Sequence, residues 1–297
     1  MRRQRKGSCG MCCNNKIAIL TDTNSGITEE MQKKLGVFVV PMPITVDGLE
    51  YFTGVPITEE DFYRQLRHGA SVSTSQPSPE QVMTAWSNLL RTHDTVIYIP
   101  MSGGLSGSVQ SARAIASEYR NVYVVDNRRV SVTLRQSVLE AKRLADAGES
   151  AENIVRFLED DALNADIYLA VNTLEFAKRS GRVTSAAAAL SAVLSLKPVL
   201  RIQGDKLDAY HRVRGMNAAM DIMIEALKKD RAEQFAGQRV TIRAAYAGDE
   251  AKGELWRNRL QDAFPDLTIE KDPLSISVAC HTGEDALGVG IMRDTLS

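Results

Sequence analysis

Short apolar runs alternate with helix-like segments through the first half of the chain, and this alternation restricts the fold more than any other feature. Each run ends in polar or turn-forming residues, a pattern typical of strands that are buried on both faces of a sheet. The runs are Lys16–Asp22, Val37–Pro43, Thr95–Pro100 and Asn121–Asp126. Strands that alternate with helices predict a mostly parallel sheet that helices cover on both faces.

Helix start and stop signals fill the segments between these runs. Thr28 stands where an N-cap is expected, Gly36 where a helix ends, and Pro79 at the first helical position, which tolerates proline. The predicted helices are Thr28–Leu35, Thr58–Leu66, Pro79–Arg91, Ser108–Tyr119 and Ser131–Ala147. We therefore predict an N-terminal α/β domain at residues 16–165, with a looser excursion at 45–72 that ends in a polar loop.

The second half of the chain has a different pattern. Its predicted helices are Ser150–Leu163, Leu174–Ser180, Ser185–Ser195, Asn217–Lys229 and Glu250–Phe264. Its predicted strands are Pro198–Ile202, Leu207–Val213, Val240–Ala247, Leu267–Glu270, Ser275–Cys280 and Gly288–Met292. The first two strands are separated by a glycine-containing turn, which predicts a hairpin. This mixture predicts a C-terminal α+β domain at residues 166–297.

Composition narrows the class of protein. The chain has 297 residues, and its net charge of −1 disfavours a nucleic-acid-binding protein, which would carry a basic surface. No apolar stretch approaches the roughly 18–20 residues that span a bilayer, so no transmembrane segment is predicted. The N-terminal residues lack the apolar segment of a signal peptide, and we expect a cytoplasmic protein.

Residues 1–15 form a basic, cysteine-containing segment that we predict to be a disordered tail. Cys9 and Cys12 have the spacing of metal ligands, with Cys13 beside them. No second ligand pair follows, and two ligands do not close a structural zinc site, so no metal site is predicted. Metal or redox chemistry in the tail is the alternative reading.

Two polar loops carry the groups that best suit an anionic ligand. The first spans Ser73–Ser78 and includes Thr74, and the second spans Ser102–Gly107, between a strand and a helix. Loops at the carboxyl ends of parallel strands commonly bind ligands. The N-terminus of a helix offers unpaired N–H groups and a partial positive charge to an anion. The alternative for each loop is a capped turn without a ligand.

The second loop also suggests a serine-dependent acyl hydrolase or phosphotransferase that uses the Ser102–Ser106 loop. The segment Gly104–Ser108 departs from the G-x-S-x-G pattern at its last position, which is serine. Among the histidines, His281 lies in the most loop-like surroundings, at the end of a predicted strand. A structural role for this histidine is the alternative reading.

Five blocks in order resemble the motifs of the DegV family of bacterial fatty-acid-binding proteins, over Lys16 to about Arg293. An opening strand ends in Thr21-Asp22-Thr23-Asn24. The five blocks follow it, and the family motif that each resembles is given in parentheses. They are Thr74–Ser78 (T-S-Q-P-S), Ser102–Ala112 (S-S-G-L-S-G-T-x-x-S-A), Leu174–Val183 (L-x-x-L-x-R-G-G-R-I), Lys197–Leu200 (K-P-I-L) and Cys280–Gly288 (T-H-x-G-P-G-A-L-G). The chain departs from these motifs at Gly103, at Ser180 and at Glu284-Asp285, which replace serine, glycine and Pro-Gly.

The resemblance implies a two-domain fold with a long-chain fatty acid, such as palmitate, between the domains. The carboxylate is expected near the threonine and serine motifs and the acyl chain in an apolar tunnel. The implied ligand-binding residues are Thr74, Ser102, Gly103, Ser106, Arg182 and His281. The resemblance further implies a lipid-binding protein rather than an enzyme, with no cofactor and no catalytic residue. Some relatives present the lipid to a fatty acid kinase for phospholipid synthesis, and transient membrane contact is compatible with that role.

Overall fold

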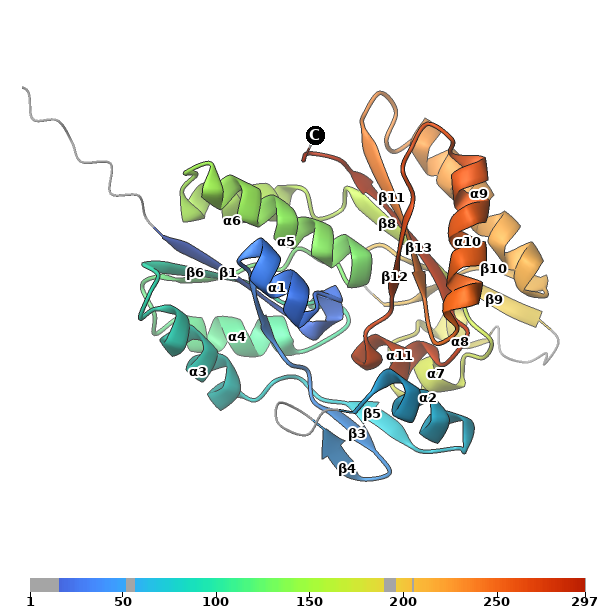
Figure 1. Ribbon diagram of the computed structural model, residues 1–297, viewed down its shortest axis with the longest axis horizontal. Helices are drawn as coiled ribbons and strands as arrows, with labels where there is room; N and C mark the ends of the chain where they lie inside the picture. The colour runs from blue at the N-terminus through green and yellow to red at the C-terminus, as the bar shows by residue number, and fades with distance from the viewer. Residues whose placement is uncertain (1–15, 52–56, 190–195, 205, 297) are drawn as a thin grey trace, which may run out of the picture.

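In a computed structural model, which describes residues 16–51, 57–189, 196–204 and 206–296, the described chain forms three sheets (Figure 1). The predicted tail with Cys9, Cys12 and Cys13, and the end of the helix predicted at Ser185–Ser195, lie outside these residues. Among the described helices, none is both long and apolar enough to cross a membrane.

The first sheet confirms the parallel arrangement. Its order is β2-β1-β6-β7, and every neighbouring pair is parallel. The strands are β1 (Ile17–Asp22), β2 (Phe38–Val40), β6 (Thr95–Ile99) and β7 (Val122–Val124). A short 3-10 helix, η1 (Thr23–Ser25), follows β1.

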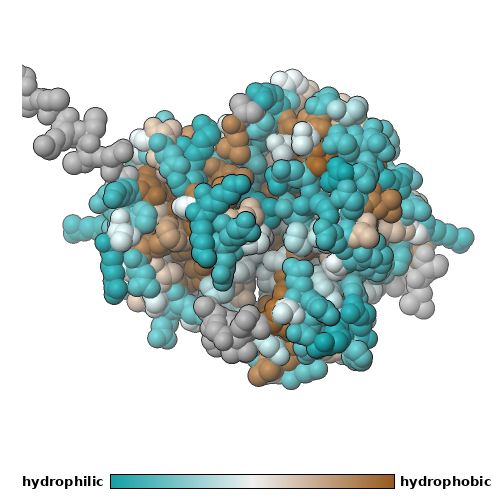
Figure 2. Space-filling view, in the orientation of Figure 1, coloured by the Kyte–Doolittle hydropathy of each residue, from teal (hydrophilic) through white to brown (hydrophobic). Residues whose placement is uncertain are grey.

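Helices cover both faces of this sheet, as predicted. One face packs against α1 (Glu29–Leu35), α5 (Ser131–Asp146) and α6 (Ala151–Asp160), and the other against α3 (Pro79–Leu89) and α4 (Ser108–Ala116). The Thr28 hydroxyl accepts a bond from the Met31 N–H, and Gly36 ends α1 in the left-handed conformation, so both boundary predictions are confirmed. On the face that Figure 2 shows, most of the surface is hydrophilic, with scattered hydrophobic patches.

The second sheet lies in the C-terminal half, in the order β10-β9-β8-β13-β11-β12. Its strands are β8 (Ala165–Ala170), β9 (Leu196–Ile202), β10 (Asp208–Arg214), β11 (Val240–Tyr246), β12 (Glu270–Pro273) and β13 (Leu287–Arg293). The predicted hairpin of β9 and β10 is confirmed as antiparallel. One face of the sheet packs against α9 (Met216–Ala232) and α10 (Glu250–Ala263). The other face turns toward the first half of the chain.

The sequence reading missed β8, a central strand of this sheet. All six residues of β8 are buried, including the carboxyl group of Asp166. An acidic residue inside a buried strand runs against the usual pattern, because an isolated buried charge is costly. Here the Asp166 carboxylate accepts a 2.8 Å bond from the Arg201 Nε of β9. The partner that permits this strand therefore lies 35 positions away in the sequence.

A third, antiparallel sheet forms within the excursion at 45–72, where strands were not predicted. It consists of β3 (Ile44–Val46), β4 (Leu49–Tyr51) and β5 (Val72–Thr74), in the order β4-β3-β5. The helix α2 (Glu59–Arg67) leads back to β5, and Thr58 caps it. Thr74 is thus the last residue of a strand rather than part of a polar loop. Two-residue turns and three-residue strands give too little hydrophobic alternation to be recognised.

The strand predicted at Ser275–Cys280 is wrong, because these residues form the helix α11 (Ile276–Thr282). The alternation of serine with isoleucine and valine resembles a strand. The Ser275 hydroxyl instead accepts a bond from the Val278 N–H and caps the helix. The neighbouring strand β12 also begins later than predicted, at Glu270. The remaining described helices are α7 (Glu175–Arg179) and α8 (Ser185–Ala189).

The helix α5 lies between the first and second sheets. Leu134 and Val138 pack toward the parallel sheet, while Val132 packs in the cluster that faces the second sheet.

Buried arginines hold α5 in this position. Arg129, just before α5, donates bonds of 2.6 Å to both the carboxylate and the carbonyl oxygen of Asp161. Arg135 on α5 donates to the Gly26 carbonyl at 2.9 Å and to the Asp272 carboxylate of β12 at 2.5 Å.

We expect Arg129→Met to lower the free energy of unfolding by about 3 kcal/mol or more, because it leaves buried Asp161 and Glu140 without this cation. Arg113→Met is the matched control, since the Arg113–Glu159 pair is about half exposed, and its cost should stay below about 1 kcal/mol. Urea unfolding of both variants measures the difference. Equal losses would show that the Arg129 network does not stabilise the junction.

Candidate ligand-binding cavity

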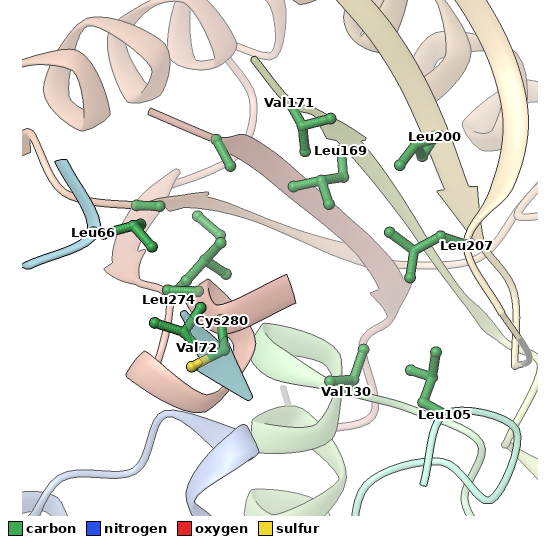
Figure 3. Close-up of a cluster of buried hydrophobic side chains, with 14 of the residues drawn as sticks. Leu66, Val72, Leu105, Val130, Leu169, Val171, Leu200, Leu207, Leu274 and Cys280 are labelled. Atoms are coloured by element: carbon green, nitrogen blue, oxygen red, sulfur yellow. The ribbon is translucent and has the colours of Figure 1, made fainter. Parts of the chain in front are cut away.

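A cavity lies between the second sheet and the elements that face it. The empty space between its lining residues, with the open solvent at its mouth included, is about 830 Å³. Figure 3 shows the buried apolar cluster of this region, to which both halves of the chain contribute, and Leu105, Val130, Leu169, Leu207 and Leu274 of this cluster line the cavity. The apolar lining comprises Met42, Met101, Leu105, Val130, Val132, Ile167, Leu169, Ile202, Leu207, Ala245, Leu274, Val278 and Val289.

Polar side chains gather at one part of this lining, where α11 packs against β5. The Thr74 hydroxyl at the end of β5 lies 2.8 Å from the Nε2 of His281 in the last turn of α11. Thr74 and His281 are 207 positions apart, so only the packing of the short helix on the third sheet joins them.

Arg182 lines the same cavity and is partly buried. Its guanidinium donates to two main-chain carbonyls, those of Ser180 and, at 3.4 Å, Leu105. No carboxylate lies within ion-pair distance of Arg182 in the part of the chain that the structure describes. A cation bonded only to carbonyl oxygens keeps its full charge and attracts an anion. The Arg182 carbonyl accepts a 2.9 Å bond from the Leu207 N–H, which fixes its backbone beside the β9–β10 hairpin.

The imidazole of His281 is held neutral. Burial, and secondarily the nearby charge of Arg182, lower the pKa of His281 from 6.5 to about 4. At neutral pH the ring therefore carries no charge, and its buried Nδ1 has no hydrogen-bond partner within the described chain. No aspartate or glutamate lines the cavity among the described residues, so the polar part carries the single charge of Arg182.

Ser106 also lines the cavity. Its hydroxyl lies 2.8 Å from the Ser108 hydroxyl and accepts a 3.2 Å bond from the Ser108 N–H, at the start of α4. A serine nucleophile needs a base within hydrogen-bonding reach. None of the hydrogen bonds of Ser106 within the described chain involves a histidine. The geometry thus gives no support to a serine hydrolase at this loop.

Ser102 and Gly103 do not line the cavity, although both were predicted to bind the ligand. The Ser102 hydroxyl is fully buried and donates to the carbonyl of Gly204, in the turn between β9 and β10. The Gly103 N–H donates to the Asp126 carboxylate at 3.1 Å. A Cβ on Gly103 would lie 2.7 Å from an oxygen of Asp126, which accounts for glycine here. Of the predicted residues, the cavity therefore brings together Thr74, Ser106, Arg182 and His281.

The departures at Glu284 and Asp285 do not bring negative charge into the cavity. Glu284 pairs with Arg67, and Asp285 pairs with Lys252 at 2.7 Å. Both carboxylates are thus matched by cations outside the cavity lining.

Five polar residues of the lining were missed, and two of them, Gln76 and Asn24, connect neighbouring segments; the others are Ser75, Ser131 and Thr282. Gln76 donates through Nε2 to the Ser111 hydroxyl at 2.7 Å, which ties the segment after β5 to α4. Asn24 donates to Asp22 at 2.8 Å and accepts from Ser277 of α11 at 2.8 Å. Gln76 and Asn24 both lie in segments that resemble the family motifs, and this location in the sequence could have indicated that they line the site.

Comparison with known proteins shows a close likeness along almost the whole chain. Residues 16–294 match the family described as "Uncharacterised protein, DegV family". A DegV domain-containing protein of Deinococcus radiodurans is 36% identical over 278 residues, 93% of this chain and 98% of that protein.

Solved structures share the fold. A fatty-acid-binding DegV family protein of Thermus thermophilus has a TM-score of 0.85 and 32% identity, and covers 94% of this chain and 100% of its own. DegV of Bacillus subtilis, described as a fatty acid binding protein, has a TM-score of 0.83 and 25% identity, with coverage of 94% and 100%.

The low pKa of His281 predicts an acid-sensitive fold. Because the folded-state pKa is about 4 and the unfolded value is about 6.5, the unfolded chain binds this proton first as the pH falls. The ligand-free protein should lose roughly 1–2 kcal/mol of stability through this group between pH 7 and pH 5. Urea unfolding of the wild type and of His281→Asn at both pH values isolates the contribution. The same pH dependence in both proteins would contradict it.

Proposed function

The chain belongs to the DegV family, and from that premise we propose that it binds a long-chain fatty acid. The carboxylate would bind at Arg182, Thr74 and Ser106, with His281 behind Thr74. The acyl chain would lie along the apolar lining. The observation that carries the proposal is an apolar cavity with one polar part, whose only charge among the described lining residues is an arginine without an acidic partner.

The hydrogen bonds of this polar part suit a carboxylate. We assign the His281 proton to Nε2, so that the ring donates to the Thr74 oxygen across the 2.8 Å contact. The Thr74 hydroxyl can then donate its own proton to the ligand. Arg182 supplies a charge-assisted bond, which is stronger than a neutral one. A neutral histidine leaves a net charge of one at the site, and this matches a single carboxylate.

The two ends of the ligand would contribute differently to the free energy of binding. Burial of about 15 methylenes at roughly 0.8 kcal/mol each gives about 12 kcal/mol before the costs of binding. A charge-assisted hydrogen bond adds only about 1.5–3 kcal/mol. The acyl chain thus provides most of the affinity, and the polar residues determine which end of the ligand lies beside Arg182.

The relatives support this ligand class. The structurally similar proteins of Thermus thermophilus and Bacillus subtilis are described as fatty-acid-binding proteins. Both chains align over their full length, so the sheets on either side of the cavity belong to the shared fold.

We expect freshly purified protein to carry a fatty acid, and the emptied protein to bind added palmitate. Native mass spectrometry, followed by solvent extraction and identification of the lipid, measures both. A ligand-free mass together with no uptake of palmitate would refute the proposed function.

A pair of arginine variants tests the position of the carboxylate within the same experiment. Arg182→Met should weaken palmitate binding roughly tenfold to a hundredfold, because it removes the charge-assisted bond. Arg179→Met is the control, since Arg179 is exposed, pairs with Glu175 on α7, and lies outside the cavity lining. Equal affinities of the two variants would place the carboxylate elsewhere.

We also propose that the bound lipid is presented to a fatty acid kinase, as in some members of the family. Arg182 is partly exposed, so the carboxylate end would lie near the surface, where a second protein can reach it. With ATP and a fatty acid kinase present, hydroxylamine should trap an acyl hydroxamate only when this chain is added. Equal hydroxamate without the chain would contradict a presenting role.

A further inference from the structure

Gly288 is the second residue of a buried strand inside the second sheet, where glycine is an unfavourable choice. It belongs to β13, which has β8 on one side and β11 on the other. Glycine weakens strand interiors because it loses more backbone entropy on folding and packs no side chain. A glycine at such a position needs a reason, either in the fold or in a ligand that approaches the backbone closely.

The fold gives such a reason for Gly290 but not for Gly288. A Cβ on Gly290 would lie 2.8 Å from the Val132 Cγ2 and 3.0 Å from the Thr133 Cγ2 of α5, so the close packing of this helix excludes a side chain. A Cβ on Gly288 would meet nothing closer than the end of the Leu169 side chain, at 3.3 Å. Gly288 also lies outside the set of glycines with positive φ. The backbone conformation therefore does not require glycine at position 288, and the packing restricts it less than at Gly290, since a Cβ would need only the flexible end of Leu169 to shift by a few tenths of an ångström.

Gly288 does line the ligand cavity. In register it lies between Ala245 of β11 and Leu169 of β8, and both of these also line the cavity. Residues directly opposite on neighbouring strands share a face of the sheet. The floor of the cavity is therefore lowest where Ala245 and Gly288 lie side by side, and the backbone of β13 is open to a ligand there.

We propose that Gly288 is a specificity-determining residue: the acyl chain crosses β13 in direct contact with its backbone, and this depression allows the distal part of a long chain to enter. The inference rests on the proposed function, because it assigns one segment of the cavity floor to the fatty acid. It identifies the preferred ligands as fatty acids long enough to reach beyond β13. A side chain at position 288 would obstruct that distal part and leave the polar end unchanged.

The test measures the affinities of saturated fatty acids of increasing length for the wild type, Gly288→Ala and Gly288→Val. In the wild type, each added methylene should raise the affinity about fourfold until the cavity is full. Both variants should match the wild type for short chains. Their affinity should then stop rising at the length that reaches β13, with at least a tenfold loss for the longest chains with Gly288→Val.

A variant in the polar part of the cavity shows what a defect that is independent of chain length looks like. Thr74→Ala should weaken every fatty acid by a similar factor, because it removes a contact that all chain lengths share. The ligand-free Gly288→Ala protein should melt close to the wild-type temperature, since its methyl group needs only a small shift of the Leu169 side chain and alanine restricts the unfolded chain more than glycine does. This variant keeps the test valid if Gly288→Val folds poorly.

A loss that is the same at all chain lengths in the Gly288 variants, or no loss at any length, would overturn the inference while the wild type still bound fatty acids. A wild type that bound no fatty acid of any length would overturn the proposed function and this inference together. Affinities that diverge only beyond one chain length would support the inference, and that length would locate β13 along the chain of the ligand.

Discussion

The buried arginines at the start of α5 hold together the two halves of the structure between which the cavity lies. Arg129, just before α5, pairs with Asp161 at the end of the first half, and the Asp161 carboxylate also pairs with Arg293 of β13 in the second half. Arg135 connects the turn after β1 to β12. Buried ion pairs need compensating partners, so each of them specifies one arrangement of the elements it joins more strongly than apolar contacts would. Val130, at the N-cap position of α5, and the first two residues of the helix, Ser131 and Val132, can line the cavity because these pairs fix the helix against both sheets.

The polar part of the cavity follows from the same junction. Thr74 comes from the third sheet, Ser106 from the loop before α4, Arg182 from the segment after α7 and His281 from α11. No single segment provides the whole constellation, and its electrostatics are likewise shared. Burial keeps His281 neutral, and the acidic residues that follow it pair with outside cations. Arg182 thus remains as an unmatched charge, a costly state that an anionic ligand relieves.

The sequence predicted the parts of the fold that local pattern determines. The parallel sheet, its covering helices and the β9–β10 hairpin were recognised from apolar runs, caps and a glycine turn. The parts that depend on distant partners were missed. The strand β8 was missed because it contains the acidic residue Asp166, whose partner Arg201 lies on another strand. The helix α11 was predicted as a strand because its N-cap, Ser275, also fits an alternating pattern of polar and apolar residues. Of the site, the motifs located the right segments, but they could not show which side chains in each segment face the cavity.

Ser102 illustrates that limit and also shows how such a residue can still influence the site. The loop turns tightly after it, since the Ser106 N–H donates to the Ser102 carbonyl at 3.1 Å. Ser106 consequently lines the cavity, whereas the Ser102 hydroxyl donates to the Gly204 carbonyl. Ile202 and Leu207, on either side of Gly204, line the cavity, and Leu207 also binds the backbone of Arg182. Ser102 therefore contributes to the cavity only indirectly: its hydroxyl binds the hairpin whose residues line the cavity, and Leu207 of that hairpin holds the backbone of Arg182.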